Sequence, residues 1–167
     1  MKRRVVDTNV GIVANGRDTN ATPACRLAAL EALASIVDQG SIVVDTAGEM
    51  QEEYRKYFSP SGQPGVGDRF FQMVLMSFAG RVERVELEKR ADGAFVDFPA
   101  DGDLAGFDFA DRKFAAAARK LNVPVLNAVD SDWLDCYEAL VRNGIAVDFV
   151  CGLDSTVWIA NGPQFRD

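Results

Sequence analysis

The sequence predicts an α/β fold in three layers, in which helices cover both faces of a mainly parallel sheet. Short apolar runs typical of buried strands alternate along the chain with longer stretches of helical spacing. Turn-forming residues separate these segments. Repeated strand–helix units favour a parallel sheet, because each helix carries the chain back to begin the next strand. The 167 residues suit a single domain, 1–167, since they are enough for one core and too few for two.

The first strand and the first helix are predicted from apolar runs and from the residues that end them. Residues 5–6 form a short buried strand that passes directly into a polar cluster beginning at Asp7. A helix is expected to begin at Thr22, as N-cap, with Pro23 in its first position, and to stop at Gly40. The apolar residues at helical spacing, which we expect on its buried face, are Leu27, Leu30, Leu33, Ala34 and Val37.

One more strand and two more helices are expected before residue 80. Residues 42–44 read as a buried strand, and Thr46 and Glu49 have the spacing of a capping box that opens a helix to about Phe58. Residues 59–67 are rich in turn formers and form a loop. The helix after this loop should bury the apolar residues Phe70, Phe71, Val74, Leu75 and Phe78.

The second half of the chain contains one long irregular segment and then two further strand–helix units. Residues 88–106 are charged and glycine-rich without steady periodicity, which predicts an insertion or a mobile loop. The regular elements expected around it are a strand at 82–87, a helix capped by Asp108 and ending at Leu121, a strand from 124 toward Asp130, a helix from Ser131 to Arg142 and a strand at 145–150.

The composition excludes several kinds of active site. The chain has no histidine, which rules out Ser-His-Asp and Cys-His catalysis, histidine general bases and zinc sites that combine histidine with cysteine. The net charge of −7 argues by itself against a nucleic-acid partner, because phosphate groups are neutralised by lysine and arginine. The same acidic excess is expected where carboxylates gather to hold divalent cations.

The N-terminus and the cysteines indicate a cytoplasmic protein. Asp7 stands where a signal peptide would need an apolar run, and no uncharged apolar stretch is long enough for a membrane span. The three cysteines, Cys25, Cys136 and Cys151, are odd in number and widely spaced. We therefore expect a soluble protein without a membrane partner, with the cysteines as buried structural thiols in a reducing compartment.

Carboxylates lie at or just beyond the carboxyl ends of the predicted strands, or open the helix at Asp108. In open α/β sheets this edge is where ligands bind. Composition and spacing therefore predict an acidic cluster that binds cations. Its candidate members are Asp7, Glu49, Glu52, Glu53, Asp108, Asp111, Asp130 and Asp132.

Four of these segments, taken in order, resemble the four acidic motifs of PIN-domain nucleases. The segments are 5–10 (Val-Val-Asp-Thr-Asn-Val), 52–54 (Glu-Glu-Tyr), 108–114 (Asp-Phe-Ala-Asp-Arg-Lys-Phe) and 130–134 (Asp-Ser-Asp-Trp-Leu), and the match spans roughly 3–150. The resemblance implies a PIN-like α/β/α fold and a metal-dependent endoribonuclease.

The first two motifs carry over with different clarity. Asp-Thr-Asn of the first motif implies Asp7 as a catalytic metal ligand, with Thr8 and Asn9 supporting it or holding water. The second motif implies a catalytic glutamate after the second strand. Glu53 fits best because a tyrosine follows it, while Glu49, the expected capping-box partner, and Glu52 stay open as alternatives.

The third and fourth motifs supply the remaining acids. They imply Asp111 and Asp130 as catalytic metal ligands, with Asp132 as an accessory ligand and Asp108 as helix cap or outer support. One position departs from the family pattern: Ala128 stands where a threonine or serine commonly precedes the fourth-motif aspartate by two residues. The departure puts one hydroxyl hydrogen bond in doubt.

The resemblance also implies the cofactor and the partners. One or two Mg²⁺ or Mn²⁺ ions would relieve the repulsion between the carboxylates and hydrolyse a phosphodiester without histidine. The expected substrate is single-stranded RNA, with DNA left open, and the expected protein partner is an antitoxin or a second copy of the chain. Arg112, beside the acids, is a candidate phosphate contact, although charges at helical spacing are commonly a solvated face.

Three other function classes are alternatives to the nuclease. A catalytically degenerate module with the same fold would bind RNA or a protein partner, and Ala128 speaks slightly for it. A phosphatase of the haloacid-dehalogenase type needs an aspartate where this chain has Asn9. A dinucleotide-binding Rossmann domain fails because no Gly-x-Gly-x-x-Gly follows the first strand.

Overall fold

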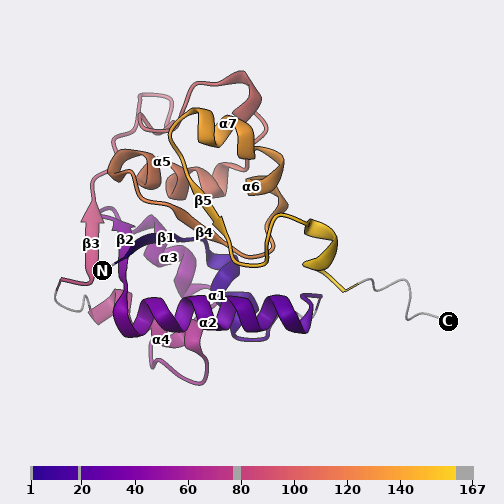
Figure 1. Cartoon of the computed structure of the whole chain (residues 1–167). Coiled ribbons are helices and arrows are strands. Elements are labelled where there is room, and N and C mark those ends of the chain that lie inside the picture. Colours follow the sequence, from indigo (N-terminus) through magenta and orange to yellow (C-terminus); the bar gives the residue numbers. More distant parts are fainter. Residues whose placement is uncertain (1, 19, 77–79, 161–167) are drawn as a thin grey trace.

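A five-stranded sheet in the order β3-β2-β1-β4-β5 forms the centre of the protein, and every neighbouring pair of strands is parallel (Figure 1). The computed structural model describes residues 2–18, 20–76 and 80–160. The strands are β1 (Arg3–Val6), β2 (Ser41–Asp45), β3 (Val82–Val85), β4 (Val125–Asn127) and β5 (Val147–Phe149). The mainly parallel sheet predicted from the sequence is therefore confirmed.

Helices lie on both faces of this sheet, which makes the three-layer α/β/α architecture (Figure 1). Within the described part of the chain, no helix has the length and apolar character needed to cross a bilayer. The α-helices are α1 (Thr8–Ala14), α2 (Pro23–Gln39), α3 (Glu49–Arg55), α4 (Val66–Met76), α5 (Arg112–Leu121), α6 (Ser131–Asp135) and α7 (Tyr137–Arg142). Short 3-10 helices lie at η1 (Gly102–Leu104), η2 (Phe109–Asp111) and η3 (Ser155–Val157).

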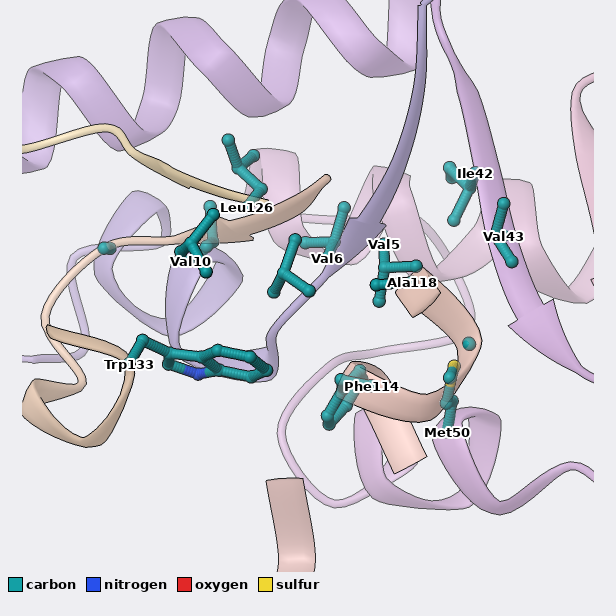
Figure 2. Packing of buried hydrophobic residues seen from close by; sticks show 14 of the residues in the cluster. Val5, Val6, Val10, Ile42, Val43, Met50, Phe114, Ala118, Leu126 and Trp133 are labelled. Carbon is teal, nitrogen blue, oxygen red and sulfur yellow. The ribbon is translucent and has the colours of Figure 1, made fainter. Parts of the chain in front are cut away.

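The core is built around the apolar residues of the central strand. Val5 and Val6 of β1 are almost completely buried, and the cluster around them includes Phe114 of α5 and Trp133 of α6 (Figure 2). Full burial of a large apolar side chain contributes about 1.5 to 3 kcal/mol. Because β1 is held on both sides by other strands and covered by these side chains, the residue that follows it, Asp7, has a fixed position.

The chain turns into a helix directly after β1, where the sequence predicted only a polar cluster. Asp7 is the N-cap of α1, and its Oδ1 accepts a hydrogen bond of 3.1 Å from the backbone N–H of Asn9. The predicted caps of α2 are confirmed: the Thr22 hydroxyl accepts from the backbone N–H of Cys25, and Gly40 is the C-cap.

The buried face of α2 differs from the predicted one. Leu27 and Leu30 are 56% and 43% exposed, so placing them in the core was wrong. The small residues Cys25 and Ala29 are buried instead, together with Leu33. Since α2 packs against α1 and α4, small side chains at these positions allow the helices to approach closely.

The capping box predicted for α3 was also wrong. The carboxylate of Asp45, at the end of β2, accepts from the backbone N–H groups of Glu49 at 2.9 Å and Met50 at 3.0 Å. Thr46 is exposed, and Gly48 in the N-cap position has φ +83°, a left-handed conformation that glycine adopts without strain. Asp45 thus supplies the cap that the sequence had assigned to Thr46.

Two further boundaries differ from the sequence prediction. The helix α3 ends at Arg55 rather than near Phe58, and the helix predicted for 131–142 is interrupted at Cys136, which separates α6 from α7.

Three of the residues predicted for the apolar face of α4 are buried: Phe70, Phe71 and Val74. Phe78, predicted for the same face, lies outside the described residues.

The segment 88–106 is irregular, as predicted, but it is anchored to the core. Its regular structure is limited to η1 and an isolated bridge between Lys89 and Phe95. Phe98 and Leu104 are buried, and the Phe98 ring stacks on Phe107 with a centroid distance of 5.8 Å. The segment therefore packs over α5 as part of the domain (Figure 1).

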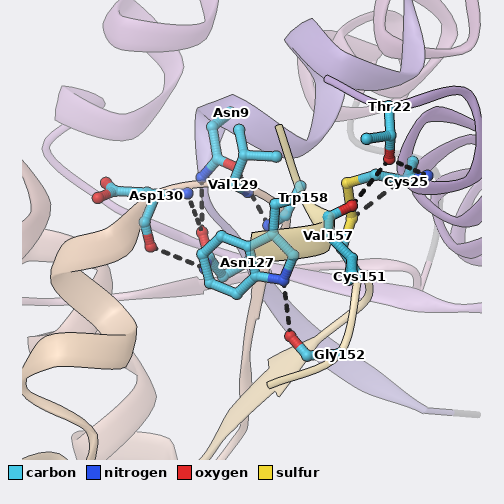
Figure 3. Close-up of a disulfide and its surroundings, with 11 residues drawn as sticks. Asn9, Thr22, Cys25, Asn127, Val129, Asp130, Cys151, Gly152, Val157 and Trp158 are labelled. Atoms are coloured by element: carbon cyan, nitrogen blue, oxygen red, sulfur yellow. Dashed lines mark hydrogen bonds between the residues drawn. A yellow bond between two sulfur atoms is a disulfide. The ribbon is translucent and has the colours of Figure 1, made fainter. Parts of the chain in front are cut away.

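The expectation of three reduced structural thiols was wrong for two of them. Cys25 at the start of α2 and Cys151 after β5 form a disulfide with a Cα–Cα distance of 5.0 Å, and Cys136 is free (Figure 3). The chain beyond β5 returns to the same place, where Trp158 donates to the carbonyl of Gly152 at 2.8 Å. The disulfide removes one of the arguments for a reducing compartment, because such bonds persist mainly in oxidising ones.

Candidate metal centre

Asp7 occupies the carboxyl end of the central strand and is only 3% exposed. Its Oδ1 accepts from the backbone of Asn9, and its Oδ2 accepts a 2.6 Å hydrogen bond from the indole N–H of Trp133. Burial and the nearby charge of Asp130 raise the pKa of Asp7 to about 6, against the lowering effect of the hydrogen bonds from Asn9 and Trp133. The carboxylate is thus fixed in position but unfavourably ionised.

Asp111 and Asp130 lie beside Asp7, and each comes from a different chain segment. One carboxylate oxygen from each of these three residues lies within 4.8 Å of the other two. Asp111 is 7% exposed at the start of α5, and Asp130 caps α6 by accepting from the backbone N–H of Asp132 at 3.0 Å. The structure therefore brings together the three acids that the first, third and fourth motifs implied.

Asp111 has the most perturbed carboxyl group of the three. Burial, the negative charge of Asp7 and a hydrogen bond to Asp130 raise the pKa of Asp111 to about 10. Without a cation, the protonated form of Asp111 is therefore favoured at neutral pH. Such mutual suppression of ionisation is expected where carboxylates are packed for cation binding.

A second acidic group shares Asp111 with the first. It consists of Asp108, Asp111 and Asp132, whose closest oxygens are again within 4.8 Å of one another among the described residues. Asp108 accepts from the backbone N–H of Ala110 at 3.0 Å, so the predicted helix cap is present at η2. Burial and the charge of Asp130 raise the pKa of Asp132. Two adjoining groups could each hold one divalent cation.

Glu53 lies next to the first motif but in neither acidic group. Its carboxylate accepts a short hydrogen bond from the Thr8 hydroxyl and forms an ion pair with Lys113 at 2.7 Å. The two alternatives, Glu49 and Glu52, form ion pairs with Lys89 and Arg55 and are also outside both groups. The sequence did not predict this pairing, in which Lys113 neutralises the glutamate expected to complete the site.

Asn9 contacts the turn before the fourth motif as well as Asp7. Its side-chain oxygen accepts from the backbone N–H groups of Ala128 at 3.0 Å and Val129 at 2.9 Å, and its amide donates to Asn127 at 2.9 Å (Figure 3). Asn127 in turn donates to the backbone carbonyl of Asp130 at 3.0 Å. Ala128 has no hydroxyl to donate. The turn from Ala128 to Asp130 is instead held by the side-chain amides of Asn9 and Asn127.

Two positioning residues could have been found only partly from the sequence. Asn127 is fully buried in β4, and a polar residue inside an apolar strand is a recognisable signal for a hydrogen-bonding role. Trp133, which lies in the fourth acidic motif, is the second of these residues. It is fully buried, and its bond to Asp7 joins residues 126 positions apart, which no local pattern reveals.

Arg112, the predicted phosphate contact, has its guanidinium bonded within the protein. It donates to the backbone carbonyls of Leu104, Ala105 and Phe107. It also lies 4.6 Å from the ring centroid of Phe98 and 4.1 Å from that of Phe109. This arrangement ties the end of the 88–106 segment to α5.

The chemistry of the donors fits a small hard cation. Asp7, Asp111 and Asp130 offer only carboxylate oxygens, which suit Mg²⁺ or Mn²⁺ better than the softer metals that prefer sulfur or imidazole. The raised pKa values of Asp7 and Asp111 give the second indication, because a divalent cation would stabilise carboxylates whose ionisation is disfavoured by burial and by their mutual repulsion. The residues present therefore fit the implied metal.

Fold and site together define a three-layer α/β protein, with the parallel sheet carrying acids from three segments at its carboxyl edge. No family model matches the chain, and neither does any curated protein. Two solved structures are similar to the chain at low sequence identity. The structure of FitAB bound to an IR36 DNA fragment has a TM-score of 0.46 and 19% identity, over 88% of this chain and 94% of that one. The structure of VapBC2 from Rickettsia felis, bound to a DNA fragment from their promoter, has a TM-score of 0.41 and 13% identity, over 88% and 98%.

Proposed function

We propose that the protein is a metal-dependent endonuclease that hydrolyses phosphodiester bonds of single-stranded RNA. The observation that carries the proposal is the buried group formed by Asp7, Asp111 and Asp130, whose oxygens lie within 4.8 Å of one another. A structural ion-pair network would place cations of the protein among such acids. Here the acids face one another, and burial together with the neighbouring carboxylates raises the pKa of Asp7 and of Asp111.

Each residue of the site has a proposed task. Asp7, Asp111 and Asp130, with Asp132 as accessory, hold one or two Mg²⁺ or Mn²⁺ ions, which supply Lewis-acid activation of water and of the phosphodiester. Trp133 fixes the orientation of the Asp7 carboxylate through its indole N–H. The side chains that hold the other parts of the site are Thr8 and Lys113 on Glu53, and Asn9 and Asn127 on the turn before Asp130.

Glu53 stays in the proposed catalytic set, in an outer position. Its hydrogen bond to Thr8, the residue after Asp7, keeps it beside the first acidic group. Lys113 forms an ion pair with it at 2.7 Å. A carboxylate held in this way is suited to orient water or a substrate group, rather than to bind the first metal ion.

The test is cleavage of labelled single-stranded RNA and DNA by the wild-type protein and by Asp7→Asn, with Mn²⁺, with Mg²⁺ and with chelator. Glu31→Gln is the matched control, because Glu31 is exposed on α2 and forms no side-chain hydrogen bond or ion pair among the described residues. Cleavage by wild type and Glu31→Gln, but not by Asp7→Asn or with chelator, supports the proposal. DNA cleavage without RNA cleavage would correct the substrate.

The second candidate is a catalytically degenerate module that binds RNA or a protein partner. The observation that favours it is the ion pair between Glu53 and Lys113, which holds the expected catalytic glutamate outside both acidic groups. If no variant cleaves nucleic acid and calorimetry detects no Mn²⁺ binding, while RNA binding persists, this candidate replaces the nuclease.

For the biological role we propose a toxin of a toxin–antitoxin pair, as the sequence resemblance implies. Expression of the wild-type chain alone should arrest growth, whereas Asp7→Asn should not. The partners that follow from this role are an antitoxin and a second copy of the chain. Light scattering of the purified protein, with and without a co-expressed candidate antitoxin, measures both.

A further inference from the structure

A cavity of about 560 Å³ lies between the 88–106 segment and the start of α5. Aromatic rings and cationic side chains share its lining: Phe95, Phe98, Phe109, Lys89, Arg90 and Arg112. Two acidic residues, Glu49 and Asp92, line it as well, so cations are in the majority although the whole chain has a net charge of −7. Rings that accept stacking, next to cations that attract phosphate, are the features by which proteins bind single-stranded nucleic acid.

Phe109 is the most exposed of these rings, and it is already held in a stack. The residue is 78% exposed, although burying a phenylalanine is favourable. The guanidinium of Arg112 lies 4.1 Å from its ring centroid and 4.6 Å from that of Phe98. Because Arg112 is itself fixed by backbone carbonyls, one side of the Phe109 ring is supported while most of the residue stays open to solvent. We call this exposed, supported ring of Phe109 the stacking platform, because a planar group could stack on it.

The charges of the cavity leave one cation available. Lys89 is paired with Glu49 at 3.1 Å, and the Asp92 carboxylate accepts from the backbone N–H of Ala94 at 2.9 Å. The side chain of Arg90 is exposed and makes no hydrogen bond or ion pair among the described residues. An anionic group could therefore bind Arg90 without breaking an existing contact.

The platform is continuous with the metal centre along the chain. Phe109 belongs to the same short 3-10 helix as Asp111 and directly follows Asp108, and these two acids belong to the second acidic group. We propose that the cavity binds a nucleobase that flanks the cleaved phosphate, with the base stacked on Phe109 and a neighbouring phosphate near Arg90. This inference rests on the proposed nuclease function and assigns that site its substrate contact.

The first experiment measures binding alone, by fluorescence anisotropy of a labelled single-stranded oligoribonucleotide with the full chain in chelator. Phe109→Ala should weaken binding roughly 5- to 20-fold, as expected for loss of one base–aromatic stack. Phe109→Leu, which keeps apolar bulk without a π face, should weaken it nearly as much. Tyr57→Ala is the matched control, because it removes a part-exposed ring that does not line the cavity, and it should bind as wild type.

A second oligonucleotide, abasic at one position, identifies the group that is bound. For one position along the strand, removing the base should weaken binding to wild type but not to Phe109→Ala, since that variant has already lost the stack. If abasic and intact RNA bind wild type equally at every position, or if Phe109→Leu binds as wild type, the nucleobase assignment is overturned. Equal binding of abasic and intact RNA would mean that the cavity does not bind a nucleobase, and a side chain of a protein partner would become the alternative ligand.

Cleavage of labelled single-stranded RNA with Mn²⁺ separates this inference from the proposed function. Asp7→Asn should lose cleavage at every RNA concentration, whereas Phe109→Ala should raise the RNA concentration needed for half-maximal cleavage by about the factor by which it weakens binding. If neither wild type nor Glu31→Gln cleaves RNA, the nuclease proposal fails. The binding measurements then decide the cavity separately, because they use no metal ion.

Discussion

Replacing Asp111 by asparagine should change how the stability of the metal-free protein depends on pH. In the folded protein, burial and the neighbours Asp7 and Asp130 raise the pKa of Asp111 to about 10, whereas an unfolded aspartate has a pKa of about 3.9. Between pH 6 and 8 the folded state therefore binds one more proton than the unfolded state. By linkage, this residue lowers the free energy of unfolding by about 1.4 kcal/mol for each unit of rising pH.

Asparagine removes this dependence and keeps the geometry. Its amide has the shape of the protonated carboxyl group and can still donate a hydrogen bond to Asp130. The free energy of unfolding of Asp111→Asn minus that of wild type should therefore increase by roughly 3 kcal/mol from pH 6 to pH 8, which is two units at about 1.4 kcal/mol each. At pH 4, where the unfolded carboxyl group is itself partly protonated, the two proteins should differ much less.

Urea unfolding in chelator at pH 4, 6, 7 and 8 measures this difference. Glu31→Gln should follow wild type at every pH, because Glu31 is exposed and belongs to neither acidic group. If the difference between Asp111→Asn and wild type is the same from pH 6 to 8, then Asp111 is ionised in the metal-free protein. That result would refute the conclusion that Asp111 is protonated in the metal-free folded protein. With Mn²⁺ the trend for wild type should reverse, since metal binding displaces the proton.

Three other substitutions test contacts around the site and the disulfide. Asn9→Ala removes three hydrogen bonds to the β4–α6 turn and should cost about 2 to 4 kcal/mol in urea unfolding; a loss below 1 kcal/mol would contradict their proposed role. Lys113→Met leaves Glu53 without its cation and should cost about 1 to 3 kcal/mol, of which Glu53→Gln in the same chain should restore a part; no recovery would show that the ion pair is not the cause. Cys25→Ser should cost about 2 to 5 kcal/mol, because the bond to Cys151 closes a loop of 126 residues, and thiol reductant should then lower the melting temperature of wild type but not of the variant.

Most of the fold followed from sequence patterns that act over a few residues. The strands were found because β-branched apolar runs are short and bounded, and α2 was found because Thr22 and Pro23 mark a helix start. The helix α1 was missed since its seven residues, beginning at Thr8, continue an apolar run that also suits a strand. The exposure of Leu27 could not be foreseen, because it depends on which face α1 and α4 cover.

The sequence predicted the acids of the candidate site, but not the contacts that position them. Asp7 and Asp130 meet because they follow parallel strands whose carboxyl ends share one edge. Asp111 joins them from the start of α5, the helix that precedes β4. The pairing of Glu53 with Lys113 joins α3 to α5 across 60 positions and needs the packed structure. The same holds for the disulfide, since the sequence does not show which cysteines the fold brings together.

The strand order makes β1 the strand that connects the two sides of the sheet. The pairs β2–β3 and β4–β5 do not touch each other in the sheet, because β1 lies between them. Strand β1, near the start of the chain, therefore joins two pairs of strands that have no other contact in the sheet. Asp7 is attached to the end of that joining strand. A chain whose first strand has not inserted lacks the central acid too, so the site is assembled only in a molecule whose sheet is whole.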